Sequence, residues 1–194
     1  MIMDPELFDA LRPVIAALEQ LGIKYYVGGS VASSAYGESR STQDADLAAQ
    51  LTVAHIAPLM ASWQNEFYVT EPTMREAIER RRCFNLIHLP TMMKVDIFVP
   101  QAVPFDQSTL ERASRMTLTS RGQHLDVWMA SPEDVILHKL VWYRKGGEIS
   151  ERQISDIRNI VKLQGPNLDR NYISRWAKEL AVEDLWLHAQ KANS

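Results

Sequence analysis

The chain is poor in cysteine, has no long apolar run and carries no strong excess of charge of either sign. Cys83 is the single cysteine among 194 residues, which excludes an internal disulfide framework and a zinc site built from cysteines. No apolar run approaches the ~18 residues that a membrane-spanning helix needs, and the first residues lack the basic and apolar segments of a secretory signal. We therefore expect a cytoplasmic protein with no membrane partner.

The balance of charge and hydrophobicity is that of an ordinary globular protein. The formal net charge is -3 and the pI is ≈ 6.0, which excludes a uniformly basic coat for nucleic acid. Hydrophobic residues make up 46% and charged residues 23%, so the chain can bury a core and is not a disordered or low-complexity segment. The local run Arg80-Arg81-Arg82 has two interpretations: a solvated helix face, or a contact with a nucleic-acid backbone or a triphosphate.

Hydrophobic patterning divides the chain into two parts. Strand and helix patterns alternate as far as Ala130, and helical periodicity alone follows. We expect an α+β fold, with a small mixed β-sheet core over residues 1–130 and a C-terminal helical bundle over 131–194 packed on it. The expected helices are 4–20, 30–36, 52–63, 73–82, 104–115, 131–145, 150–163 and 169–192, and the expected strands are 23–27, 44–48, 67–69, 83–89, 92–99 and 125–129.

A glycine pair follows the first expected strand. Gly28-Gly29 ends that strand and Ser30 opens a short helix, so bare backbone N–H groups and a helix N-terminus meet at one point. Both features favour a phosphate, and the Ser30 hydroxyl can cap the helix or reach a phosphate oxygen. The sequence is neither a Walker A loop nor Gly-x-Gly-x-x-Gly, and a tight turn without a ligand is the alternative.

Two aspartates lie on one face of the next expected strand. In a strand, residues i and i+2 point the same way with Cα atoms about 6.6 Å apart, so Asp44 and Asp46 form a like-charge pair. Such a pair repels unless a cation lies between the carboxylates. Magnesium prefers carboxylates and substrate phosphates as ligands. An Asp-x-Asp pair on its own is also typical of a solvated strand end or a turn.

A third aspartate interrupts an apolar strand. Asp96 lies between Val95 and Ile97 and points to the opposite face from them. A carboxylate in a central strand is costly unless it is paired or binds a metal. A site for two metal ions requires a further carboxylate of this kind. A salt bridge from Asp96 to Lys94 or to a nearby arginine is the alternative.

The helical part contributes two more candidates. Ser131-Pro132-Glu133-Asp134 has the residue types of a helix start, and Lys139 then falls within an apolar stripe of that helix. A lysine in such a position must extend to solvent or meet an anion. Asp156 follows on the next helix, so an ordinary ion pair between the two helices is the simple interpretation.

Other chemically capable residues are expected to pack rather than bind. No histidine pattern typical of a metal site or catalytic triad is present. Cys83, which opens an expected strand, is most simply a buried apolar residue. Packing is likewise the interpretation we favour for His138 and for the tryptophans at positions 128, 142, 176 and 186.

The combined spacing resembles that of a known superfamily. Gly29-Ser30, then Asp44-Ala45-Asp46-Leu47 after a gap of thirteen residues, then Asp96 on a later strand resemble the pattern of the DNA polymerase beta nucleotidyltransferase superfamily. Arg40-Ser41-Thr42-Gln43-Asp44 is similar to the Arg-x-Thr-x-Asp segment of small prokaryotic members. Ser-x-Glu-Asp-x-Ile-x-x-Lys-Leu from Ser131 and Gln-x-x-Asp-Ile from Gln153 look like the later motifs of abortive-infection nucleotidyltransferase toxins. The similarity covers residues 21–163.

The resemblance implies a role for each matching residue. Asp44 and Asp46 would bind two Mg²⁺ ions, and Asp96 would hold the ion that activates the acceptor hydroxyl. All three would be catalytic. Lys139 would contact the triphosphate and Asp156 would support the site. The implied nucleotide-binding positions are Gly28, Gly29, Ser30, Arg40, Thr42, Lys139 and Asp156.

The resemblance also implies an activity. A member would transfer a nucleoside monophosphate from a nucleoside triphosphate such as ATP to a hydroxyl acceptor, which is a tRNA, a protein or a small molecule. An antitoxin or a second copy of the chain would be its partner, as in toxin–antitoxin systems. Two alternatives remain: a non-catalytic nucleotide-binding regulator or antitoxin-like module with the same fold, and a phosphohydrolase using the same acids.

Overall fold

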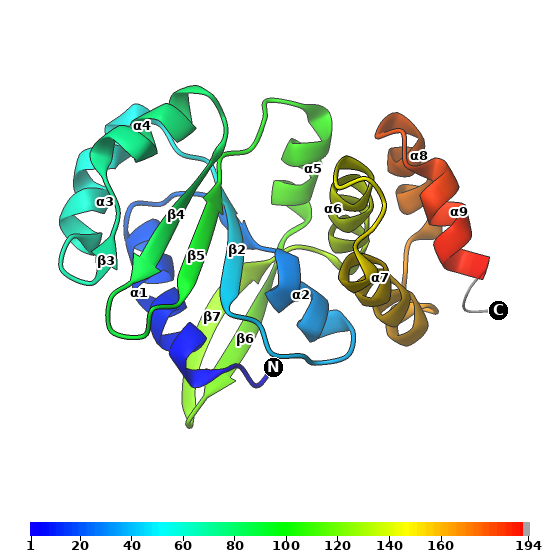
Figure 1. The fold of residues 1–194 in the computed structure, drawn as a ribbon, viewed down its shortest axis with the longest axis horizontal. Coiled ribbons are helices and arrows are strands. Elements are labelled where there is room, and N and C mark those ends of the chain that lie inside the picture. The colour runs from blue at the N-terminus through cyan, green and yellow to red at the C-terminus, as the bar shows by residue number, and fades with distance from the viewer. Residues whose placement is uncertain (192–194) are drawn as a thin grey trace.

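A mixed seven-stranded sheet forms the centre of the protein (Figure 1). The computed structural model describes residues 1–191, and its strands run in the order β3-β4-β5-β2-β1-β7-β6. β2 pairs parallel with β5 and β1 pairs parallel with β7, whereas the other neighbours are antiparallel. The strands are β1 Tyr25–Val27, β2 Asp44–Ala49, β3 Phe67–Tyr68, β4 Cys83–His88, β5 Lys94–Phe98, β6 Ser114–Ser120 and β7 Gln123–Met129.

Helices pack against the sheet, and α6 to α9 form a group at one end of the molecule (Figure 1). Asp4, Ser131 and Ser150 accept hydrogen bonds from backbone N–H groups at the starts of their helices, as capping residues do. None of the helices in residues 1–191 is long and apolar enough to cross a membrane. The helices are α1 Pro5–Gln20, α2 Gly29–Tyr36, η1 Val53–His55, α3 Ile56–Trp63, α4 Glu71–Glu79, α5 Pro104–Arg112, α6 Pro132–Lys145, α7 Glu151–Gln164, α8 Arg170–Glu179 and α9 Glu183–Lys191.

Two helices position the acidic strands from different sides. α1 buries the stripe Leu7, Leu11, Ile15 and Leu18 against the core, and it contacts β2 and β5. α2 contacts β2 as well as α6 and α7. α2 therefore lies between the strand that carries Asp44 and Asp46 and the C-terminal helices. The expected α+β class, with a mixed sheet and C-terminal helices, is confirmed.

Two of the expected elements are wrong. The helix expected over 104–115 ends at Arg112, and Ser114–Ser120 form the edge strand β6, which pairs with β7. β6 has only two apolar residues, Met116 and Leu118, so its sequence does not show the pattern of a strand. Of its side chains, only those of Leu118 and Ser120 are buried.

The helix expected over 169–192 is two helices, α8 and α9. Ala181, at φ 56, makes the turn between them without a glycine or proline to mark it. Residues 192–194 of the second expected unit lie outside the described residues. The division of the chain at residue 130 remains a prediction.

Candidate functional site

Strand register brings the three acids together. In the parallel pair β2–β5, Asp46 lies directly beside Asp96, and Asp44 lies beside Lys94. Neighbouring strands are about 4.8 Å apart, and side chains two residues apart point to the same face. The alternating residues Ala45, Leu47, Val95 and Ile97 are buried in the core on the other face. The acids expected to converge therefore share one face of two adjacent strands.

The electrostatics of Asp46 reflect this crowding. Burial raises the pKa of the Asp46 carboxyl, and the neighbouring carboxylates of Asp44 and Asp96 raise it further, to about 6. Lys139 and the backbone N–H of Ser30 act in the opposite direction. A partly desolvated group of like charges is favourable only with a cation close by.

Lys94 and Thr42 hold parts of this cluster. Lys94 Nζ lies 2.8 Å from Asp96 Oδ2, so the salt bridge considered as the alternative is present. Asp96 Oδ1 is buried and has no hydrogen-bond partner within residues 1–191. Thr42 Oγ1 donates to Asp44 Oδ1 at 2.8 Å, which orients the first carboxylate. One oxygen of Asp96 is thus neutralised and the other is left without a partner.

The residues fit a magnesium site that a substrate completes. Within residues 1–191, no three or more His, Cys, Asp or Glu side chains form a ready-made metal cage. Mg²⁺ does not require one, because it is usually bound by one or two carboxylates together with water and substrate phosphates. The unpartnered Asp96 Oδ1 and the repulsion at Asp46 are what a hard divalent cation would relieve. Asp44, Asp46 and Asp96 are the residues that would hold it.

The glycine turn is packed directly against Asp46. The Gly28 N–H donates to the Asp46 carbonyl at 2.8 Å, and α2 begins at the next residue. Gly29 has φ +52, and a Cβ at this position would overlap the Asp46 carboxylate. Only glycine combines this backbone conformation with so close an approach. The N-terminus of α2, where phosphate is favoured, therefore adjoins the acids.

Asp156 links the remaining predicted residues. Its Oδ2 accepts from Lys139 Nζ at 2.8 Å and from Arg40 Nη2 at 3.0 Å, and the same Nη2 donates to Ser30 Oγ at 2.7 Å. Burial raises the pKa of Asp156, but the hydrogen bonds from Arg40 and Lys139 outweigh it and hold this pKa below its usual range. Burial lowers the pKa of Lys139 despite that partner. The expected ion pair between the two helices, Lys139 with Asp156, is present, and Asp156 also accepts a hydrogen bond from Arg40 that was not expected.

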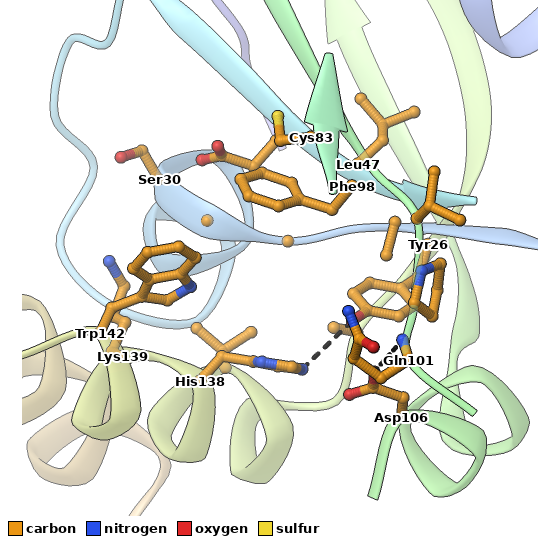
Figure 2. Close-up of a pocket in the computed structure, with 18 of the residues that line it drawn as sticks. Tyr26, Ser30, Leu47, Cys83, Phe98, Gln101, Asp106, His138, Lys139 and Trp142 are labelled. Carbon is orange, nitrogen blue, oxygen red and sulfur yellow. Dashed lines mark hydrogen bonds between the residues drawn. The ribbon is translucent and has the colours of Figure 1, made fainter. Parts of the chain in front are cut away.

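A cavity of ≈ 570 Å³ opens beside the glycine turn (Figure 2). Its volume is within the range typical of small-molecule sites. Among the predicted site residues, Gly28, Gly29, Ser30, Asp46 and Lys139 line it. The other five, Asp44, Asp96, Arg40, Thr42 and Asp156, do not line it but hydrogen-bond to or adjoin residues of the cluster.

Several cavity residues were missed or assigned to packing. Trp142 is 49% exposed and lines the cavity, and Trp128 is also exposed, whereas Trp176 and Trp186 are buried as expected. Cys83 is only half-buried and lines the same cavity. The only sequence signal for Trp142 was its position three residues after Lys139, on the same helix face. The further lining residues include Tyr26, Arg81, Arg82, Phe98, Gln101, Asp106 and Gln153.

His138 lies at the side of the cavity away from Ser30 (Figure 2). Its Nε2 lies 3.1 Å from the Tyr26 hydroxyl, and its ring packs against Phe105. Burial lowers the pKa of His138 to about 4, so the imidazole is neutral at physiological pH. Packing was expected for this residue, but its ring also faces the cavity.

Comparison with known proteins identifies the fold. No family model and no curated protein matches the chain. Among solved structures, an antigenic nucleotidyltransferase-like protein from Paracoccidioides brasiliensis aligns with TM-score 0.53 and 20% identity, covering 98% of this chain and 94% of that one. The antibiotic-resistance factor ANT(2'')-Ia aligns with TM-score 0.57 and 14% identity, covering 96% of this chain and 99% of that one. The chain therefore has the fold of nucleotidyltransferase structures.

Proposed function

We propose that the protein is a magnesium-dependent nucleotidyltransferase, which transfers a nucleoside monophosphate from a nucleoside triphosphate to a hydroxyl acceptor. The observation that carries this proposal is the register of Asp46 beside Asp96, next to a glycine turn that only Gly29 can make. The fold shared with nucleotidyltransferase structures agrees with it. The roles of the individual residues are those that the resemblance of the sequence motifs implies, and the geometry of the chain supports them.

The residues divide the work of the reaction between them. Bound Mg²⁺ would supply charge neutralisation at the phosphates and polarise the attacking hydroxyl. Asp44 and Asp46 would hold the ions, and Asp96 would complete the ligands on the side of the acceptor. The start of α2 at Gly29-Ser30, with the Ser30 hydroxyl, binds the triphosphate.

The transfer itself replaces one bond to phosphorus by another. The acceptor oxygen bonds to the α-phosphorus while the bond to the bridging oxygen breaks, releasing pyrophosphate, and the hydroxyl proton passes to water. Lys139, held by Asp156, neutralises charge on the departing pyrophosphate. Arg40 positions the Ser30 hydroxyl and Thr42 orients Asp44. Catalysis is then positioning and electrostatic stabilisation.

The acceptor is a small molecule, a tRNA or a protein. A small molecule is the first to test, because the cavity has the size of a small-molecule site and one structural neighbour is an antibiotic-resistance factor. A relationship to abortive-infection toxins, with an antitoxin or a second copy as partner, remains part of the proposal.

One observation favours a second candidate function. The Lys94 ammonium already neutralises part of the acid cluster, as it would in a nucleotide-binding regulator that has no need of metal. Such a module would keep the fold and the cavity but transfer nothing. A phosphohydrolase using the same acids is the remaining alternative.

Transfer of label from a nucleotide tests the proposal. The protein is incubated with Mg²⁺ and each α-³²P nucleoside triphosphate, together with total tRNA, a protein extract or a pool of small metabolites. We expect covalent label in one acceptor class, loss of that label in Asp46→Ala, and no loss in the control Asp9→Ala, which lies on α1. A binding module would leave no covalent label, and a phosphohydrolase would release phosphate or pyrophosphate without labelling an acceptor.

A further inference from the structure

We propose that Trp142 and Phe98 form the subsite for the nucleobase, with the base stacked on the Trp142 indole. This inference rests on the proposed function and adds the part of the nucleotide that the acids and the glycine turn do not bind. It assigns a ligand-binding role to a tryptophan that sequence patterning alone assigned to packing.

On the face of the sheet that carries Asp46 and Asp96, the residues two positions further along β2 and β5 are apolar. Ala48 lies beside Phe98 in the β2–β5 register, just as Asp46 lies beside Asp96. Both pairs are on the same face, and two strand residues span about 6.6 Å. Ala48 and Phe98 line the cavity together with Asp46. When the α-phosphate of a nucleotide lies at Asp46 and Asp96, its ribose has room between this pair and the pair Ala48–Phe98. Its base then reaches Phe98.

The Trp142 indole packs against Phe98 on the wall of the cavity. Its ring centroid lies 6.0 Å from that of Phe98 with an interplanar angle of 64°, an edge-on arrangement. Trp142 comes three residues after Lys139 on α6, so the two side chains are neighbours on the helix surface, as Figure 2 shows. The residue that is proposed to bind phosphate and the ring that is proposed to bind the base thus share one helix face.

The exposure of Trp142 is what points to a ligand. Trp142 lines the cavity and is 49% exposed, so a large part of its indole faces solvent. A nucleobase stacked on the indole would cover this apolar surface. Its other partner within the described chain is the exposed side chain of Lys145, whose Nζ lies 5.4 Å from the ring centroid. Every nucleobase has a π-face, so stacking of this kind accepts any base. We therefore expect little preference among nucleoside triphosphates from Trp142.

Comparing ATP with inorganic tripolyphosphate isolates the base. Binding of each ligand in the presence of Mg²⁺ is measured by calorimetry for the wild-type protein, Trp142→Leu, Trp142→Phe and the control Trp128→Leu, a second exposed tryptophan on β7. We expect Trp142→Leu to bind ATP at least about fivefold more weakly and to bind tripolyphosphate as the wild type does. Trp142→Phe retains most of the ATP affinity, and Trp128→Leu is unchanged for both ligands.

Each other outcome has a definite meaning. Wild-type affinity for ATP in Trp142→Leu overturns the subsite and leaves the proposed function standing, including the case in which the tryptophan contacts the acceptor instead. An equal loss for ATP and tripolyphosphate also overturns it, because the indole would then act on the phosphate end. Failure of the wild-type protein to bind either ligand contradicts the proposed function itself. Lys139→Met, which weakens both ligands, shows that the assay detects loss at the phosphate end.

Discussion

The Lys94 ammonium lies 2.8 Å from Oδ2 of Asp96, so the third acid of the cluster has a countercharge from its own strand. Lys94 is 40% exposed and can move away, whereas the Asp96 side chain is only 12% exposed. A metal ion that binds Asp96 must therefore compete with this lysine for one carboxylate.

Lys94→Met should strengthen the binding of a divalent cation. Removing a competing charge of a partly exposed pair is worth about 1 kcal/mol, which corresponds to roughly a fivefold gain in affinity. Titration with Mn²⁺ followed by electron paramagnetic resonance measures this directly, and Lys162→Met, an exposed lysine on α7, is the control. Equal or weaker binding by Lys94→Met would show that Lys94 does not compete with the ion.

Asp46→Asn should stabilise the protein at neutral pH. The pKa of Asp46 is about 6 in the folded chain, because of burial and the adjacent carboxylates, against 3.8 for an ordinary aspartate. Between these values the folded state binds more protons than the unfolded state, so the free energy of unfolding falls as pH rises from about 4 to about 6. At pH 7 this destabilisation is fully present and amounts to about 3 kcal/mol, and Asp46→Asn removes most of it.

Denaturant unfolding at several pH values checks this sign. The difference between Asp46→Asn and the wild type should be largest above pH 6 and should vanish near pH 4. Divalent-cation binding by the wild type should weaken below about pH 6, since the carboxylate must be ionised to bind the ion. An Asp46→Asn protein that is less stable than the wild type at pH 7 would contradict the account of the cluster.

Gly29→Ala should damage the protein far more than Gly122→Ala. Both glycines have positive φ, +52 and +75, so both substitutions introduce left-handed strain of about 1–2 kcal/mol. Only at Gly29 does the new Cβ overlap Asp46, since nothing lies within 4 Å of a Cβ at Gly122. We expect a further loss of about 1–3 kcal/mol and loss of nucleotide binding for Gly29→Ala. Equal stabilities and equal ATP affinities for the two variants would contradict the close packing of the turn.

Asp156→Ala should destabilise the fold and weaken nucleotide binding together. Lys139 and Asp156 are each 7% exposed, so the substitution leaves a buried ammonium without its carboxylate, at a cost of about 3–5 kcal/mol. Asp184→Ala, which breaks the exposed pair with Arg144, should leave stability nearly unchanged. Thermal unfolding and ATP titration measure both effects. A stable Asp156→Ala variant with normal ATP affinity would remove Asp156 from the site.

The parts of the site that the sequence predicts are those set by local spacing. A strand periodicity of two is enough to put Asp44 and Asp46 on one face, and a strand that ends in two glycines before a helix is visible as a turn. Strands β4 and β5 follow from the two apolar runs at 83–89 and 92–99. These features depend on neighbours along the chain, and the fold class follows from their order.

The parts that it does not predict depend on contacts between distant segments. The bond from Arg40 to Asp156 joins residues 116 positions apart, and no local pattern indicates it. Strand β6 was missed because an edge strand buries little, and Trp142 because helical periodicity does not distinguish a core face from a cavity wall. Asp96 was predicted to need either a metal or a salt bridge. Only the structure shows that Lys94 pairs with Oδ2 while Oδ1 has no hydrogen-bond partner among the described residues.

The most direct measurement is a crystal structure with Mg²⁺ and a non-hydrolysable nucleoside triphosphate. The account predicts divalent ions bound by the carboxylates of Asp44, Asp46 and Asp96, with the triphosphate at the start of α2, Gly29-Ser30. Ions and triphosphate bound elsewhere, with Lys94 still on Asp96, would contradict the central claim that these acids form a nucleotidyltransferase centre.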